Sequence, residues 1–224
     1  MSLTIAIDGP AGSGKSTAAR RLARRLNYRY LDTGAMYRAV TYEVIRSDID
    51  LNYEEEVAHL AEKMEMNFTP AEGDKKSRII VEGRDITDKL RIPEVNDKVS
   101  RVARIKGVRE VMVKKQRALS ANGGLIMDGR DIGSQVLPDA DFKFYITATL
   151  EERARRRYKE IIKKKPDTDF EEIKKSVARR DKIDTERCYS PLIKPEDAVE
   201  IDTTDLSINE VVDKLYNIIK EGTS

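Results

Sequence analysis

A glycine-rich segment near the start of the chain constrains the fold more than any other feature. The segment IAIDGPAGSGKST (5–17) fits the pattern G-x-x-x-x-G-K-[ST], beginning in an apolar run and leading into an amphipathic helical pattern at 15–26. Glycines let backbone N–H groups curl around phosphate oxygens, and the N-terminus of the following helix favours negative charge. We therefore predict a strand, a phosphate-binding loop (P-loop) and a helix, with a nucleoside triphosphate bound at the loop.

The side chains of this loop have separate predicted roles. Lys15 is expected to reach the β- and γ-phosphates as a catalytic residue, and Ser16 to hold Mg²⁺ through its hydroxyl. The predicted triphosphate-binding residues are Gly9, Pro10, Ala11, Gly12, Ser13, Gly14, Lys15, Ser16 and Thr17. The alternative is an ordinary glycine-rich turn, but the Lys-Ser pair and both flanking patterns argue against it.

The rest of the chain alternates short apolar runs with helical patterns. In the final helix, Ser207 and Glu210 form a predicted capping box. The predicted buried strands are 3–8, 28–32, 124–128, 142–147 and 198–203. This alternation predicts an α/β fold with a five-stranded parallel sheet flanked by helices, and 224 residues suit one domain spanning 1–224.

One stretch interrupts the alternation. Residues 66–87 are strand-like and contain two turn signals, Glu72-Gly73-Asp74 and Glu82-Gly83. We interpret them as a small antiparallel β meander between helices near 53–64 and 93–103.

The tetrapeptide GRDI occurs in this meander at 83–86 and again at 129–132. For the first copy we predict turn chemistry: Gly83 bends the backbone, while Arg84 and Asp85 face solvent. The second copy follows a predicted strand, so Arg130 and Asp131 should emerge at the carboxyl edge of the sheet, where open α/β folds bind ligands. The second copy is therefore the predicted working site.

Other polar residues follow the predicted strands. Asp128 ends one of them and is expected to orient Mg²⁺ or its water, with a helix cap as the alternative. In LDTGAMYR (31–38), Thr33 is predicted to cap a helix, and Arg38 lies just inside it.

Two further stretches carry grouped charges. Arg180, Asp184 and Arg187 share one stripe of a helix, for which an exposed salt bridge is the alternative. In EERARRRYKEIIKKK (151–165), helical spacing groups three arginines that suit either a solvated face or a mobile lid over the triphosphate. These three are Arg153, Arg156 and Arg157, and the predicted lid covers about 153–172.

Composition narrows the choice of partners. Charged residues make up 37% of the chain, yet the net charge is only +2, which argues against a nucleic-acid partner. The sequence has no run of 18 apolar residues and no export signal pattern, so we expect no membrane span. Its single cysteine, Cys188, cannot form an internal disulfide and fits a protein of the reducing cytoplasm. Separately, we expect the protein to be a monomer.

Several P-loop functions remain to be separated at this point. The guanine signature N-K-x-D and the switch pattern D-x-x-G of GTPases do not occur in the sequence. The arginines and aspartates downstream instead indicate a second, anionic substrate. The alternatives are a kinase of another small molecule, such as AMP, UMP or a non-nucleotide alcohol, and a nucleotide-sensing module without turnover.

Four segments, taken in order, resemble bacterial-type cytidylate kinases, and the likeness extends over about 3–220. These segments are IAIDGPAGSGKST, YLDTGAMYR, LIMDGRDIGSQVLPDAD and RDKIDTERCYSPL. The resemblance implies a nucleoside-monophosphate-kinase fold that transfers the γ-phosphate of ATP to CMP or dCMP with Mg²⁺. It also implies an enlarged NMP-binding insertion, which 66–103 resembles.

The resemblance also implies roles for individual residues. Ser100, Arg109 and Asp131 would contact the cytosine, and Asp184 the ribose hydroxyls, with Arg180 nearby. The implied contacts of the CMP phosphate are Thr33, Arg38, Arg130 and Arg187, with Tyr37 close by. The implied catalytic residues are Lys15, Asp128, Arg130, Arg153 and Arg157, with Arg156 on ATP and Ser16 and Asp128 on the metal. Thr33 replaces a serine found in many relatives, and the hydroxyl is kept.

The cytosine assignment is chemically sensible. Cytosine presents an amino donor beside two acceptors, so a carboxylate can accept from the amino group while an arginine donates to the acceptors. Uracil presents an acceptor in place of the amino group, and a buried acceptor facing another acceptor is costly. We therefore expect a preference for CMP over UMP.

Overall fold

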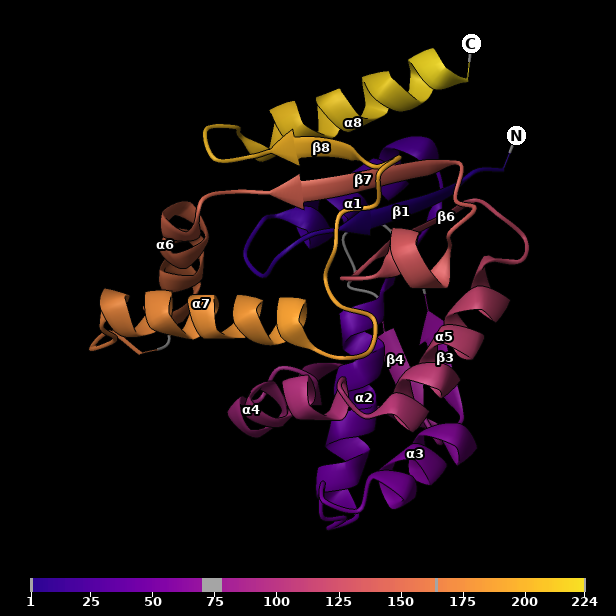
Figure 1. Cartoon of the computed structure of the whole chain (residues 1–224), viewed down its shortest axis with the longest axis vertical. Helices are drawn as coiled ribbons and strands as arrows, with labels where there is room; N and C mark the ends of the chain where they lie inside the picture. The colour runs from indigo at the N-terminus through magenta and orange to yellow at the C-terminus, as the bar shows by residue number, and fades with distance from the viewer. Residues whose placement is uncertain (1, 70–77, 164, 224) are drawn as a thin grey trace.

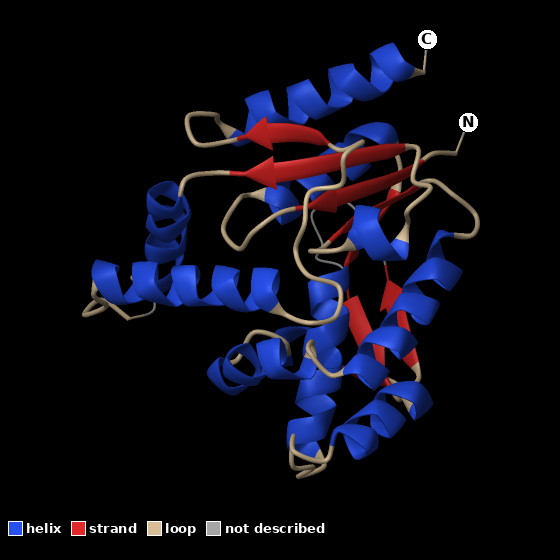
Figure 2. Cartoon of the chain, in the orientation of Figure 1, coloured by secondary structure: helices blue, strands red, loops and turns tan. Residues whose placement is uncertain are grey.

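The computed structural model describes residues 2–69, 78–163 and 165–223. Five parallel strands form the main sheet in the order β2-β6-β1-β7-β8 (Figure 2). The strands are β1 (Thr4–Asp8), β2 (Arg29–Asp32), β6 (Leu125–Asp128), β7 (Phe142–Thr147) and β8 (Val199–Asp202). The predicted five-stranded parallel sheet is confirmed, and each strand lies within its predicted range.

Helices cover both faces of this sheet (Figure 1). Successive side chains of a strand point to opposite faces, so Ile5 and Ile7 join the apolar cluster of α1 and α8, whereas Ala6 joins that of α2 and α5. The α-helices are α1 (Lys15–Leu26), α2 (Thr33–Arg46), α3 (Glu54–Lys63), α4 (Pro93–Val102), α5 (Lys106–Ser120), α6 (Leu150–Ile161), α7 (Phe170–Glu186) and α8 (Ile208–Gly222). The shorter turns are η1 (Thr87–Lys89) and η2 (Ile132–Val136), the latter a single π-helical turn.

Two helix starts test the predicted caps. The capping box of Ser207 and Glu210 is present at the start of α8. The prediction that Thr33 caps a helix is wrong. Asp32 caps α2 by accepting a hydrogen bond from the backbone N–H of Ala35 at 3.0 Å. Thr33 is the first helical residue, and its hydroxyl is free to bond elsewhere.

The insertion forms a second, antiparallel sheet of β3 (Met66–Thr69), β4 (Arg78–Val81) and β5 (Arg84–Asp85) between α3 and α4. At the turn between β4 and β5, Glu82 and Gly83 both have positive φ, 49° and 72°, which suits a two-residue hairpin. The second predicted turn signal is therefore confirmed. The first, Glu72-Gly73-Asp74, lies outside the described residues.

The first GRDI differs from its predicted form at one residue. Asp85 is exposed and accepts hydrogen bonds from Thr87, as turn chemistry predicts. Arg84 does not simply face solvent, because its guanidinium donates to the buried carboxylate of Glu43 on α2 at 3.0 Å. A buried carboxylate requires a positive partner, and Arg46 and Arg84 both supply one. Arg84 therefore ties the insertion to α2.

Residues 151–161 of the arginine-rich segment lie in α6, which packs against α7 at the carboxyl edge of the main sheet. The arrowheads of β7 and β8 point toward this pair (Figure 1). Tyr158 and Phe170 meet edge to face across it, with ring centroids 5.7 Å apart. Within the described parts of the chain, no helix has the length and apolarity needed to cross a membrane.

Candidate active site

The P-loop lies between β1 and α1, as the sequence predicts. Gly9 must be glycine, because a Cβ there would lie 2.0 Å from the carbonyl oxygen of Ile146. Gly14 has φ +87° and turns the chain directly into the first residue of α1, Lys15. The Lys15 ammonium is buried and donates to the carbonyl oxygen of Pro10 at 3.2 Å. The loop therefore presents Lys15 and the start of a helix at one place.

The Lys15 ammonium lies in a strongly positive environment. Burial, followed by the nearby Arg130 guanidinium, lowers the pKa of Lys15 to about 7. Burial and the neighbouring Arg130 and Arg38 likewise lower the pKa of Arg180 to about 10. Four cations therefore form a cluster: Lys15 of the P-loop, Arg38 of α2, Arg130 of the loop after β6 and Arg180 of α7. Such a cluster favours a highly charged anion.

Ser16 and Asp128 meet at the edge of this cluster. The Ser16 hydroxyl donates to Asp128 Oδ2 at 2.6 Å, and the Thr33 hydroxyl donates to the Asp128 carbonyl oxygen at 2.8 Å. Burial and the nearby Asp32 carboxylate raise the pKa of Asp128. The predicted metal pair, Ser16 and Asp128, is therefore brought together by the fold.

Ion pairs organise the predicted substrate residues. Arg130 donates to Asp184 Oδ2 at 2.7 Å, so Asp184 is not part of an exposed salt bridge within its own helix. Asp131 pairs through one oxygen with Arg109 and through the other with Arg187, the latter at 3.4 Å. All three of these side chains are at most 7% exposed.

The aromatic ring of Tyr37 closes this network on one side. The Arg109 guanidinium carbon lies 5.4 Å from the Tyr37 ring centroid. Burial raises the pKa of Tyr37 to about 12, so its hydroxyl stays protonated as a donor. Ser100 is half-buried on α4, and its contact with cytosine remains a prediction.

Several arginines of the site have donors available. Within the described residues, the buried Nε atoms of Arg38, Arg109 and Arg180 have no hydrogen-bond partner. Buried donors normally find acceptors in a folded protein, and those that lack one at a site favour a ligand that supplies it. Arg38 and Arg180 therefore suit a phosphate group.

Arg153 on α6 contacts the backbone of the P-loop. Its guanidinium donates to the carbonyl oxygens of Ala148 at 2.9 Å and Ala11 at 3.1 Å, and it forms an ion pair with Asp181 at 2.6 Å. Arg153 is thus no part of a solvated face. Its predicted catalytic role would require it to release at least one of these partners.

The other two arginines of α6 have different surroundings. Arg156 donates to the carbonyl oxygens of Ser13 and Thr203, at 3.2 and 2.6 Å, which joins the P-loop to the end of β8. Arg157 is 44% exposed and pairs with Glu160, a partner that a phosphate could displace. Its charge lowers the pKa of Arg38 and of Arg180, after larger contributions from burial and other cations, so it lies close to the cluster.

Sequence reasoning missed two polar residues of the site. Tyr30 donates its hydroxyl to Asp128 Oδ1 at 2.6 Å and so fixes the carboxylate that Ser16 also contacts. Asp8 accepts hydrogen bonds from the loop after β6. Asp8 stands at the end of a predicted strand, the same signal that identified Asp128. Tyr30 gave no such signal, because a tyrosine in a strand is ordinary.

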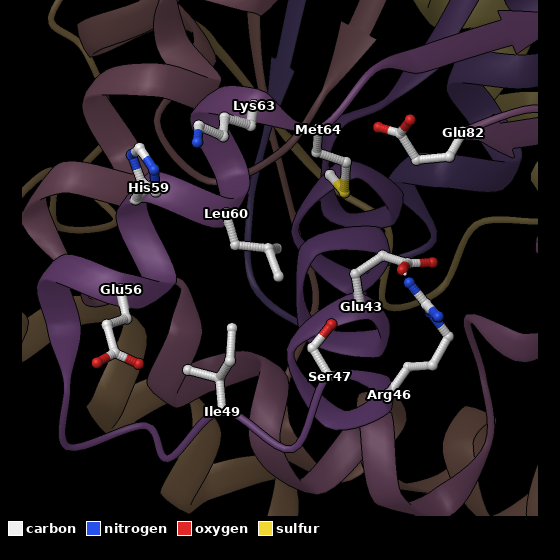
Figure 3. Close-up of a pocket in the computed structure, with 10 residues that line it drawn as sticks. All are labelled: Glu43, Arg46, Ser47, Ile49, Glu56, His59, Leu60, Lys63, Met64 and Glu82. Carbon is white, nitrogen blue, oxygen red and sulfur yellow. Dashed lines mark hydrogen bonds and ion pairs between the residues drawn. The ribbon is translucent and has the colours of Figure 1, made fainter.

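A cavity of about 440 Å³ opens elsewhere, between the far end of α2 and α3 (Figure 3). Ile49, Leu60 and Met64 line it together with charged residues such as Glu56 and Lys63. None of the predicted site residues lines it, so it is separate from the cation cluster.

Comparison with known proteins identifies the family of this chain. The cytidylate kinase family model matches residues 5–221. The chain is 47% identical over 223 residues to the cytidylate kinase of Caldanaerobacter subterraneus subsp. tengcongensis, covering 100% of this chain and 97% of that protein. It is 48% identical over 219 residues to the cytidylate kinase of Bacillus subtilis, covering 98% and 97%.

A solved structure from Eubacterium ventriosum shares the fold, with a TM-score of 0.51, 14% identity and coverage of 99% of both chains. At that identity the likeness extends to the fold alone. The match to the family model and the identities to the two named kinases cover nearly the whole chain. The chain therefore belongs to the cytidylate kinase family, of the bacterial type.

Proposed function

We propose that the protein transfers the γ-phosphoryl group of ATP to CMP and dCMP, giving ADP and CDP or dCDP. One observation carries the proposal beyond family membership. The cation cluster of Lys15, Arg38, Arg130 and Arg180 joins the P-loop to the buried Asp131 network. A triphosphate on one side and a nucleoside monophosphate on the other would bring two phosphate groups to this cluster.

The roles of the residues follow from their surroundings. Lys15 and the P-loop N–H groups would hold the β- and γ-phosphates, with Arg156 and Thr17 beside them. For the CMP phosphate we propose Thr33, Tyr37, Arg38, Arg130 and Arg187. For the base we propose Ser100, Arg109 and Asp131, and for the ribose Asp184 with Arg180.

The residues present fit Mg²⁺. This ion usually binds through one or two protein oxygens together with phosphates and water. Ser16 Oγ and Asp128 Oδ2, 2.6 Å apart, are such a pair. Among the described residues, no cluster of three carboxylate, histidine or cysteine side chains could hold a metal alone, so phosphates would complete the ligand set. When bound, Mg²⁺ supplies positive charge against the phosphate oxygens.

The reaction needs positioning more than acid–base chemistry. An oxygen of the CMP phosphate attacks the γ-phosphorus, and the bond from that phosphorus to the β–γ bridging oxygen breaks, which releases ADP. The attacking phosphate is largely ionised near neutral pH, with a second pKa of about 6, so no strong base is required. Lys15 and the arginines neutralise the charge that develops between donor and acceptor.

Two further parts of the chain would serve this step. We propose that the insertion 66–103 binds the monophosphate and that about 153–172 closes as a lid, with Arg153 and Arg157 moving onto the transferring phosphoryl group. Their present partners, Asp181 and Glu160, are carboxylates that phosphate oxygens would replace. We further propose that the protein works as a monomer in the cytoplasm, for which light scattering and fractionation are the tests.

An ADP-release assay with CMP, dCMP, UMP, AMP and shikimate tests the proposed activity. We expect CMP and dCMP to be the preferred acceptors, and Lys15→Ala to lower turnover by orders of magnitude while leaving the fold intact. Faster turnover of AMP or shikimate would identify a different kinase. Nucleotide binding without turnover of any acceptor would identify a sensing module.

A further inference from the structure

The carboxylate of Asp8 is a buried charge that the proposed mechanism does not use. Asp8 is the last residue of β1, directly before Gly9 of the P-loop, and only 2% exposed. Burial raises the pKa of Asp8 to about 6, although two backbone N–H groups act in the opposite direction. A buried carboxylate is retained only where hydrogen-bond donors compensate it, and its donors indicate its role.

Both donors come from the loop after β6. Asp8 Oδ1 accepts from the N–H of Ile132 at 2.8 Å, and Oδ2 accepts from the N–H of Gly133 at 2.7 Å. These are the first two N–H groups of η2, which a helical turn cannot satisfy internally. Asp8, on a strand far away in the sequence, thus caps the start of η2.

A second tie holds the other end of this loop. The N–H of Gly129 donates to the carbonyl oxygen of Ile7 at 3.0 Å. Gly129 is also tightly packed, because a Cβ there would lie 2.6 Å from the Thr33 hydroxyl oxygen. Arg130 and Asp131 therefore stand between two fixed points, both at the end of β1. The directions of the Arg130 and Asp131 side chains therefore depend on the hydrogen bonds of Gly129, Ile132 and Gly133 to the end of β1.

We propose that Asp8 is a positioning residue for nucleotide recognition, which holds the loop 129–133 so that Arg130 and Asp131 meet CMP. The inference rests on the proposed function and assigns Asp8 to the monophosphate side of the site. A role in shaping the P-loop is the competing reading, because Asp8 is joined directly to Gly9. The two readings differ in whether a substitution of Asp8 raises KM for CMP or KM for ATP.

The test compares wild type with Asp8→Asn, which keeps the shape but turns an NH₂ group toward one of the two N–H donors. With CMP and UMP varied at saturating ATP, we expect KM for CMP to rise about tenfold or more and the preference for CMP over UMP to shrink. KM for ATP should stay within about twofold. An equal rise in KM for ATP would overturn the proposal in favour of the P-loop role.

The matched control is Leu215→Ala, a fully buried residue of α8 on the other face of the sheet. It lowers stability without touching the loop, so its KM for CMP should match that of wild type. If Asp8→Asn also lowers stability but leaves KM and selectivity unchanged, Asp8 is only a structural cap and the proposal is wrong.

Amide hydrogen exchange separates this inference from the proposed function. In Asp8→Asn, exchange should become faster within 129–136 and remain unchanged in α8. Unaltered exchange in that loop would refute the positioning role whether or not the protein acts on CMP. If wild type fails to phosphorylate CMP, the proposed function fails while the exchange result still decides the structural part. Should Asp8→Asn not fold, Asp8→Ser takes its place, with the same expected pattern.

Discussion

The two copies of GRDI make a controlled experiment, because the same substitution can be placed in each. Asp131→Ala removes a carboxylate that pairs with Arg109 and Arg187 among side chains at most 7% exposed. Asp85→Ala removes a carboxylate that is 47% exposed, accepts hydrogen bonds from Thr87 two residues away and lies 3.9 Å from the exposed Arg78. The structure therefore predicts very unequal consequences.

The magnitude for Asp131→Ala has two parts. Removing one partner from a buried ion pair leaves a buried charge and costs about 3–5 kcal/mol of stability. Losing a hydrogen bond from the cytosine amino group to a charged acceptor costs about 1.5–3 kcal/mol of transition-state binding. At about 1.4 kcal/mol per tenfold, kcat/KM for CMP should fall roughly 10- to 150-fold. The preference for CMP over UMP should shrink with it.

The assay measures kcat/KM for CMP and UMP at fixed ATP and Mg²⁺, below the melting temperature of the least stable variant, together with denaturant unfolding. Asp85→Ala should keep the selectivity of wild type. If Asp85→Ala loses selectivity for CMP while Asp131→Ala keeps it, the wrong copy has been assigned. If Asp131→Ala is as stable as wild type, the buried ion pairs do not contribute as argued.

Three further outcomes are expected. The pKa of ligand-free Lys15 is about 7 and a bound phosphate favours its charged form, so ATP binding should take up close to one proton at about pH 8 and less at about pH 6. Calorimetry in buffers of different ionisation enthalpy measures this proton uptake. Equal proton uptake in Lys15→Ala would contradict the assignment to Lys15. Asp184→Ala should lower kcat/KM for both CMP and dCMP if the carboxylate accepts a hydrogen bond from the 3′-hydroxyl, and for CMP alone if it accepts one from the 2′-hydroxyl. Unchanged kcat/KM with both substrates would exclude contact between Asp184 and the sugar. Arg84→Ala removes one of two partners of buried Glu43 and should lower the free energy of unfolding by about 1–3 kcal/mol, measured with denaturant. The control Arg78→Ala, at an exposed residue, should lower it by less than about 0.5 kcal/mol. Equal decreases in the two variants would argue against the tie between Arg84 and α2.

The elements of the fold follow from local sequence. The apolar runs predict all five strands of the parallel sheet, and the helical pattern at 15–26 matches the bounds of α1. The capping box of α8 and the turn at Glu82-Gly83 were also predictable. The cap and the turn form between residues a few positions apart, whereas the strands pair with distant strands and are predictable because their burial shows in the local apolar pattern.

The strand-end residues of the site were predictable for a related reason. Parallel strands place their carboxyl ends at one edge, so polar residues that follow strands converge there whatever the order of the strands. Lys15, Asp128 and Arg130 meet in this way. The resemblance to cytidylate kinases added Arg109, and it assigned a predicted role to Asp184, which helical spacing had already grouped with Arg180 and Arg187.

Only the tertiary structure decided which charges become partners. Arg84 pairs with Glu43 across 41 positions, Tyr30 with Asp128 across 98, and Asp8 with Ile132 across 124. Asp8 carried the signal of a polar residue at a strand end, but no local pattern identifies the partner of any of these side chains, because a buried polar group takes whichever partner the packing of distant elements brings within hydrogen-bond distance. The sequence therefore determined which elements and which chemistry this protein has, and the packing of those elements decided how Asp8, Tyr30 and Arg84 take part.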